Sequence, residues 1–144
     1  MAETLGSLCD KLTIVKLKQY HSIDAKRLDS LNIQEIQLKE EIDQYVNDAL
    51  SGKIPLDRLN FAANKVYKHE GNETRAIKGS LGGVFAVLAH VNCELWHEQE
   101  KVYEFHTVPI EDKDKVVKRL AILNLERNQC MDELNSILTK LCQK

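Results

Sequence analysis

Proline, glycine and aromatic residues are scarce in this sequence. Its 144 residues include two prolines, six glycines, three phenylalanines, four tyrosines and one tryptophan. So few aromatic residues are unusual for a β-sandwich or barrel, whereas the abundant leucine, glutamate, lysine and isoleucine favour helices. The length is that of one globular domain, residues 1–144, and excludes a multidomain enzyme. We therefore expect a single all-α domain.

The sequence also has no excess of charge of either sign and no long hydrophobic run. Twenty basic and 22 acidic residues leave a formal net charge of −2, which generates no field that would gather nucleic-acid phosphates or anionic lipid. No stretch approaches the ~18 apolar residues of a membrane-spanning helix, and Met1 to Asp10 lack the basic and apolar segments of a secretion signal. We expect a cytoplasmic protein without a nucleic-acid or membrane partner.

Motifs of known catalytic and metal centres are missing as well. The four cysteines form no C-x-x-C pair and have no histidine at ligand spacing, which predicts reduced thiols and no zinc or redox site. No serine lies in a nucleophile elbow, and no glycine-rich phosphate loop follows a strand. We therefore predict no catalytic residue, no metal and no cofactor.

The interval from Ser7 to Ser51 contains neither proline nor glycine, and its apolar residues recur by threes and fours along one helical seam. The seam consists of Ile14, Leu17, His21, Asp24, Leu28, Leu31, Glu35, Leu38, Ile42, Tyr45 and Ala49. One continuous helix is the favoured prediction. It would be about 65 Å long, which implies a bundle that is elongated or shared between subunits. The alternative is a break near Asp29 to Asn32, where Asn32 and Glu35 would form a capping box.

Further helices are predicted after Gly52 ends this first element. A short helix opens with Pro55 in its first turn, has Leu59, Ala62, Ala63 and Val66 on one face, and ends near Gly71. The glycines between Lys78 and Gly83 form the loosest part of the chain. Heptad spacing returns from Val84 to Phe105, and again from Val117 to Leu141. The sequence therefore predicts an elongated antiparallel helical bundle with three long helices and one shorter helix.

Polar side chains occupy positions on these hydrophobic seams. They include His21 and Asp24 in the first element, Glu98 in the third helix, and Asn124 and Arg127 in the last helix. Because a buried charge costs several kcal/mol unless it is paired, Arg127 should have a carboxylate partner. An antiparallel hairpin of the last two helices places Asn92 opposite Asn124 but leaves Glu98 far from Arg127, so Asp24 is the predicted partner.

Two interpretations of this polar layer stay open. The favoured one is that it sets helix register and oligomeric state, as polar residues inside coiled coils do. The alternative is a polar pocket between helices, where bundles place ligand and metal sites. His97 and Glu100 supply one H-x-x-E in place of the two E-x-x-H elements of a di-iron bundle. Glu40, Glu41 and Asp43 begin, but do not complete, the acidic cluster of an all-α nucleotide pyrophosphatase.

Three segments resemble sequences of small helical proteins. Residues 92–98, NCELWHE, and residues 123–128, LNLERN, are similar to the N-x-x-L-W-H-x-E and L-N-x-x-R-N elements of a domain-of-unknown-function family found in bacteria and phages, although Gln99 departs from the acidic position. Residues 10–14, DKLTI, resemble the opening of related proteins. The resemblance implies an all-helical fold and brings no established activity. Its distinctive residues are Asn92, Trp96, Glu98, Asn124, Arg127 and Asn128.

These observations together predict a self-associating interaction or assembly module without catalysis. The alternative is an enzyme that binds a small ligand or a metal, similar to an all-α nucleotide pyrophosphatase, with a polar site between helices. The residues expected in the polar layer or ligand site are Asn92, Trp96, Glu98, Asn124, Arg127, Asn128, His21 and Asp24.

Overall fold

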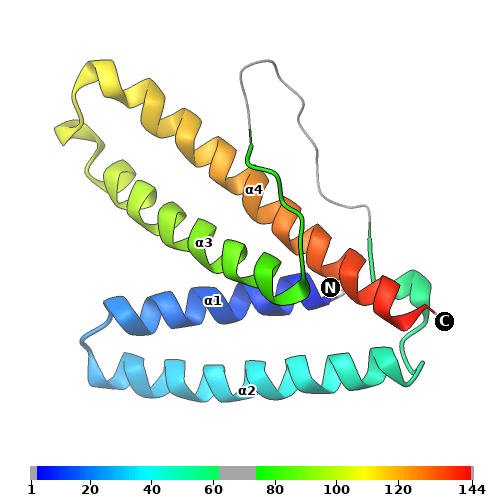
Figure 1. The fold of residues 1–144 in the computed structure, drawn as a ribbon. Coiled ribbons are helices and arrows are strands. Elements are labelled where there is room, and N and C mark those ends of the chain that lie inside the picture. The colour runs from blue at the N-terminus through cyan, green and yellow to red at the C-terminus, as the bar shows by residue number, and fades with distance from the viewer. Residues whose placement is uncertain (1–2, 62–73, 144) are drawn as a thin grey trace.

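The computed structural model describes residues 3–61 and 74–143. These residues form four α-helices, α1 (Leu5–His21), α2 (Ala25–Leu50), α3 (Leu81–Tyr103) and α4 (Ile110–Cys142), with two short 3-10 turns at Leu56–Arg58 and Phe105–Thr107. The predicted all-α, elongated antiparallel bundle is confirmed (Figure 1). Of the short helix predicted to open at Pro55, the described residues contain only the 3-10 turn Leu56–Arg58, and residues 60–61 are not helical. The rest of that prediction lies outside the described residues.

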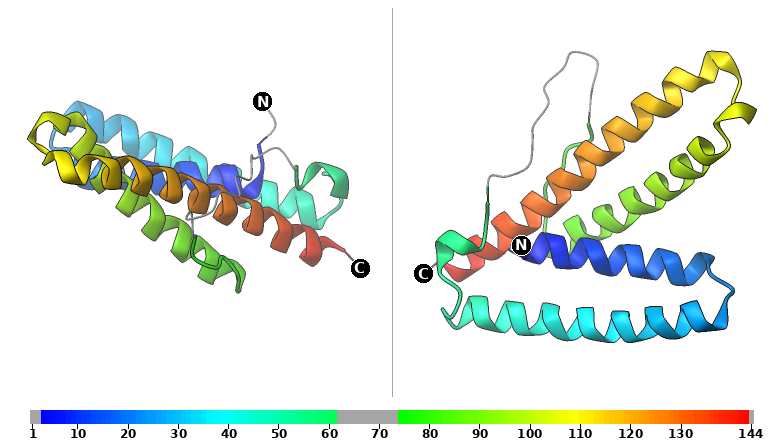
Figure 2. Two further views of the ribbon diagram at one scale, coloured as in Figure 1. Left: turned by 90° about the horizontal axis from the view of Figure 1, so that it is seen from above. Right: turned by 180° about the vertical axis from the view of Figure 1, so that it is seen from behind.

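The four helices form two hairpins, α1–α2 and α3–α4. Helix α1 lies between α2 and the second hairpin and contacts all three other helices. The hairpins converge where α1 begins and α4 ends, and they diverge toward their turns at the other end (Figure 2). We call these turns, with their flanking residues, the first tip (residues 18–27) and the second tip (residues 98–114). Among the described residues, no helix is both long and apolar enough to cross a membrane.

The prediction of one helix from Ser7 to Ser51 is wrong, because the chain reverses at residues 22–24. Asp24 has extended backbone angles, and its carboxylate accepts a hydrogen bond from the Lys26 backbone N–H at 3.0 Å, so it caps the start of α2. The alternative break near Asp29 to Asn32 is also wrong, since these residues lie inside α2. The predicted seam is correct on α2, where Leu31 and Leu38 are buried, but on α1 the residues that pack against them are Leu8 and Val15, which lie off the predicted seam.

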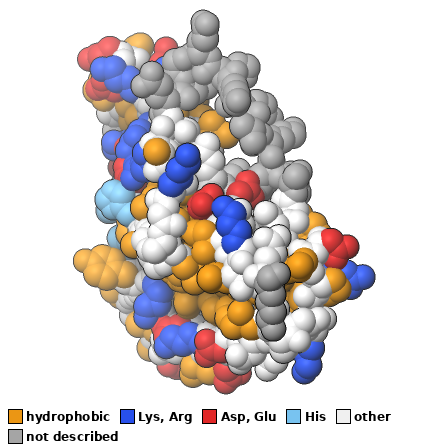
Figure 3. All heavy atoms as spheres, turned by 45° about the vertical axis from the view of Figure 1, so that its right-hand side comes forward, with side chains coloured by type: hydrophobic (Ala, Val, Ile, Leu, Met, Phe, Trp, Pro, Cys, Tyr) orange, Lys and Arg blue, Asp and Glu red, His pale blue; other side chains and the backbone are white. Residues whose placement is uncertain are grey.

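The hydrophobic core has two parts. The larger part joins the hairpins at their converging end and contains Leu5, Cys9, Ala49, Leu59, Val84, Leu88, Cys130, Leu134 and Leu138. The smaller part lies between α1 and α2 and contains Leu8, Val15, Leu31 and Leu38. Figure 3 shows hydrophobic side chains gathered over the lower half of the face at the converging end, bordered by acidic and basic side chains.

The predicted seam of α4 is displaced by one residue over its first half. Val117 is 56% exposed and Asn124 is exposed, whereas the preceding residues Val116 and Leu123 are buried. A shift of one residue rotates the buried face by about 100° around the helix axis. The rotation also buries Glu126, which the predicted seam left in solvent.

The two fully buried cysteines have neutral thiols. Burial, with the Asp10 charge nearby, raises the pKa of Cys9 to about 12. Burial and the Glu126 charge raise the pKa of Cys130 to about 11. Cys93, by contrast, is exposed.

Candidate functional site

A buried polar layer joins α1, α3 and α4, and it contains two of the predicted site residues, Asn92 and Arg127. The Arg127 guanidinium donates from Nε to Asp10 Oδ1 at 2.7 Å and from a terminal nitrogen to Asp10 Oδ2. Asn92 donates from Nδ2 to Asp10 Oδ1 at 3.0 Å and to Thr13 Oγ1 at 2.6 Å. The Thr13 hydroxyl in turn donates to the Asp10 backbone carbonyl at 2.7 Å. One carboxylate therefore connects three helices.

The Asp10 carboxylate at the centre of the layer is compensated by its neighbours. Asp10 is only 5% exposed, and the two-pronged contact with Arg127 compensates the cost of removing its carboxylate from water. Hydrogen bonding to Asp10 raises the pKa of Arg127, which keeps this guanidinium charged. Both amide hydrogens of Asn92 are used, while Asn92 Oδ1 has no hydrogen-bond partner among the described residues.

The carboxylate partner of Arg127 is therefore Asp10, and the prediction of Asp24 is wrong. The reversal at residues 22–24 carries Asp24 to the first tip, where it is exposed and caps α2. Asn92 does not pair with Asn124, which the rotation of α4 leaves exposed. A usable signal was the spacing of Asp10 and Thr13, three residues apart on one face of α1 and immediately before the predicted seam.

Two other predicted residues, His21 and Trp96, contact each other away from the polar layer. Their rings stack with centroids 4.7 Å apart and planes only 7° from parallel, and His97 meets His21 edge-on at 6.2 Å. This stack forms one wall of a cavity of about 380 Å³ between the end of α1 and the last turns of α3. We call it the notch; it is lined by His21, Trp96, Gln99, Glu100 and Tyr103.

The remaining predicted residues do not converge with these. Glu98 pairs with Lys101 at 3.0 Å on the same helix, beside a separate cavity near the α3–α4 turn. Asn128 is half-buried on α4. The eight residues predicted to share one layer are thus distributed among a polar layer, an aromatic stack, a helix cap and the helix surface.

A second polar cluster, which the sequence did not indicate, lies around Glu94. Its carboxylate contacts Arg75 at 2.7 Å, His90 at 3.1 Å and, at closer range, Arg119. Arg75 also contacts Glu126, whose carboxylate is almost fully buried. This second contact is an ion pair between Arg75 Nε and Glu126 Oε2. Arg75 thereby attaches the irregular segment 74–80 to both α3 and α4.

This cluster makes the stability of the protein depend on the ionisation of Glu94. Burial disfavours the charged carboxylate, but the hydrogen bond and charge of Arg75, with the charges of Arg119 and His90, outweigh it and lower the pKa of Glu94 below its ordinary value of 4.5. A carboxyl group whose pKa is lower in the folded state stabilises that state above the unfolded pKa. Its contribution is lost as the pH falls below 4.5 and through the folded pKa.

We therefore expect Glu94→Gln to destabilise the protein at pH 7 and to have little effect in acid. At pH 7 the loss should be about 1.5 kcal/mol, the lower end of the range for hydrogen bonds to charged groups, because Glu94 is partly exposed. Urea denaturation at a series of pH values measures the difference from wild type, which should shrink below pH 4.5. Glu40→Gln, at an exposed position on α2, is the matched control and should show no such dependence. A constant difference for Glu94→Gln at all pH values would contradict the prediction.

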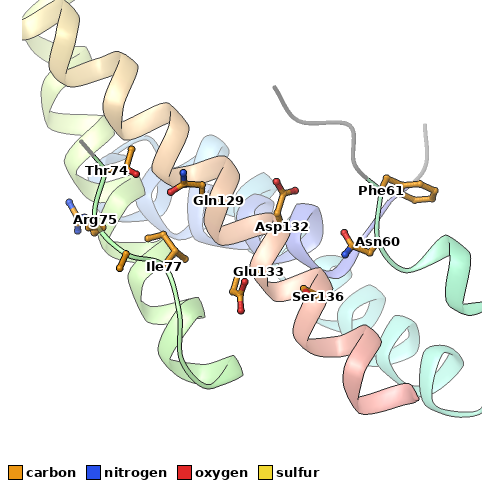
Figure 4. Close-up of a pocket in the computed structure, with 10 residues that line it drawn as sticks. Asn60, Phe61, Thr74, Arg75, Ile77, Gln129, Asp132, Glu133 and Ser136 are labelled. Atoms are coloured by element: carbon orange, nitrogen blue, oxygen red, sulfur yellow. The ribbon is translucent and has the colours of Figure 1, made fainter. Parts of the chain in front are cut away.

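The largest cavity that we describe lies beside this cluster and has a volume of about 710 Å³. It lies between residues 60–61, residues 74–77 and one face of α4 (Figure 4). Asp132 and Glu133 point to different sides of α4, and Arg75 points away from both. In the parts of the chain that the structure describes, no group of three or more His, Cys, Asp or Glu residues is arranged to hold a metal ion.

Comparison with known proteins found no matching family model, no matching curated protein and no matching solved structure. The resemblance to the domain-of-unknown-function family therefore stays an expectation.

Proposed function

We propose that this protein is a self-associating interaction module without catalysis of its own. The observation that carries the proposal is the exposure of large apolar side chains at both tips. Tyr20 is 85% and Ile23 is 99% exposed at the first tip, while Tyr103 is 79% and Ile110 is 84% exposed at the second. Each tip thus offers two large apolar side chains that a protein partner could cover.

The polar layer supports the same proposal. Asp10, Asn92, Thr13 and Arg127 use their charges and amide hydrogens on one another, which is the arrangement expected of a layer that fixes helix register. None of the three cavities described above is lined by these four residues. The near-neutral charge favours a protein partner over nucleic acid.

Light scattering after size-exclusion chromatography, over a hundredfold range of protein concentration, tests the proposal. We expect a mass of at least twice 16.5 kDa at high concentration. A monomer throughout the range would overturn it. A monomer whose melting temperature rises strongly with one nucleotide or nucleotide sugar would favour the alternative, an enzyme with a ligand site between helices.

A further inference from the structure

We propose that two copies of this chain associate tip to tip about a two-fold axis, with Ile23 of each copy inserted into the notch of the other. This inference rests on the proposed self-association and names the surface through which it occurs. The contact surface consists of the first tip and the notch beside it.

Ile23 is presented outward by an ordered turn. The turn is held on one side by the Ser22 backbone N–H, which donates to the Gln19 carbonyl at 3.4 Å, and on the other by the Asp24 cap of α2. Ile23 is 99% exposed, the highest value among the large apolar residues that the structure describes at the surface. An apolar side chain held in water at a fixed position gains from any apolar surface that covers it without a further cost of ordering the turn.

The notch has the size and lining to receive such a side chain. Its volume of about 380 Å³ lies within the range of pockets that enclose small ligands. Two of its walls are aromatic, the Trp96 ring stacked on His21 and the Tyr103 ring, and Tyr103 is 79% exposed. Stacking on His21 holds the Trp96 ring in place, so the notch is already formed in the single copy.

Ile23 and the notch are neighbours on one surface, because Ile23 follows notch residue His21 by two positions. In a two-fold contact the same patch meets itself, so a protruding residue next to a complementary hollow forms two equivalent contacts at once. A head-to-tail contact would leave one Ile23 and one notch uncovered and would continue into a chain of copies. The geometry therefore points to a closed dimer.

The charges of the tips indicate that the occupant is a second copy. The first tip carries three basic side chains and one acidic, whereas the second tip carries six acidic and two basic. Within the described residues, Lys26 and Arg27 of the first tip form no ion pair, and neither do the exposed Glu100 and Glu104 of the second. Two-fold symmetry places the basic first tip of each copy against the acidic second tip of the other copy. Two electrostatically complementary contacts therefore form in one dimer.

The test compares Ile23→Glu with Ile36→Glu by sedimentation equilibrium of the full chain. Ile36 is 56% exposed and lies on α2, three turns from the first tip, so it is a matched exposed isoleucine outside the proposed contact. We expect Ile23→Glu to weaken the dimer at least a hundredfold, and Ile36→Glu to leave it unchanged. Both variants should keep the wild-type circular dichroism, because neither side chain is in the core.

A charge exchange tests the orientation of the contact independently. Lys26→Glu with Arg27→Glu should weaken the dimer at least tenfold, and adding Glu100→Lys with Glu104→Lys should restore most of the affinity.

Three outcomes would overturn the inference. If wild type is dimeric and Ile36→Glu alone dissociates it, the contact lies on α2, and self-association stands while the tip contact fails. If the charge exchange restores nothing, the orientation is wrong. If wild type is monomeric at every concentration, the proposed function fails together with the inference.

Discussion

Replacing Arg127 with leucine is expected to cost about 3 kcal/mol of folding free energy, the lower end of the range found when one partner of a buried ion pair is removed, because Asp10 is buried but the Arg127 side chain is 34% exposed. The substitution leaves the Asp10 carboxylate, 5% exposed, without its two guanidinium contacts. Urea denaturation measures the loss as a lower midpoint. Lys118→Leu, an exposed position on the same helix, is the control and should change stability by less than about 0.5 kcal/mol.

The cost of leaving the Asp10 charge unpaired can be separated from the cost of losing the packing of the arginine side chain. Adding Asp10→Asn to Arg127→Leu removes the unpaired charge while it keeps the shape of the residue, so the double variant should be more stable than Arg127→Leu alone. Double-variant cycles of this kind isolate the coupling between two side chains. If Arg127→Leu melted like the Lys118 control, the polar layer would not be a determinant of stability, and the argument from buried charge would be wrong.

Replacing Gly6 with alanine should have the next largest effect. An added Cβ would lie 2.3 Å from the Met131 carbonyl oxygen, closer than any van der Waals contact, and the atom it meets belongs to the α4 backbone. At this crossing the Gly6 N–H also donates to Asn135 Oδ1 at 2.7 Å, a buried contact that requires the two helices to stay close. Overpacking typically costs about 1–3 kcal/mol, and we expect the upper end because the backbone must move.

Gly82→Ala is the matched control for this prediction. Gly82 lies in the first turn of α3, and its added Cβ would meet nothing within 4 Å. The control should be neutral or should stabilise the protein by up to about 1 kcal/mol, since alanine has the higher helix propensity. Thermal unfolding of both variants gives the comparison. Equal melting temperatures for Gly6→Ala and wild type would contradict a close approach of α1 and α4.

The buried faces of α2 and α3 could be predicted, because hydrophobic spacing within each helix was sufficient to indicate them. The seam of α2 was correct, because Leu31, Leu38 and Ala49 are buried in the predicted phase. The same was true of Val84 and Leu88 in α3. Each of these helices packs most of its buried face against its hairpin partner, α2 against α1 and α3 against α4, so that hydrophobic spacing alone indicates which residues are buried.

The prediction failed where two or more partners share a helix. The first half of α4 packs with Val116 and Leu123 inward, one position before the predicted seam. That face also contains Glu126, which is buried only because Arg75, from a segment far away in the sequence, supplies a charge. A pattern of hydrophobic residues could not indicate this, since the compensating residue is not on the same helix.

The candidate site divides in the same way. The sequence alone determined the helical class and the polar character of Asn92 and Arg127, because a charge or amide between apolar neighbours is recognisable from its spacing. Only the tertiary structure decided that Asp10 is their common partner. The reason is that three residues, Ser22 to Asp24, reverse the chain, and this reversal sets which part of α1 lies against α3 and α4. The pairing of Asp10 with Asn92 and Arg127 follows from this arrangement of helices, and the sequence of one helix alone cannot predict it.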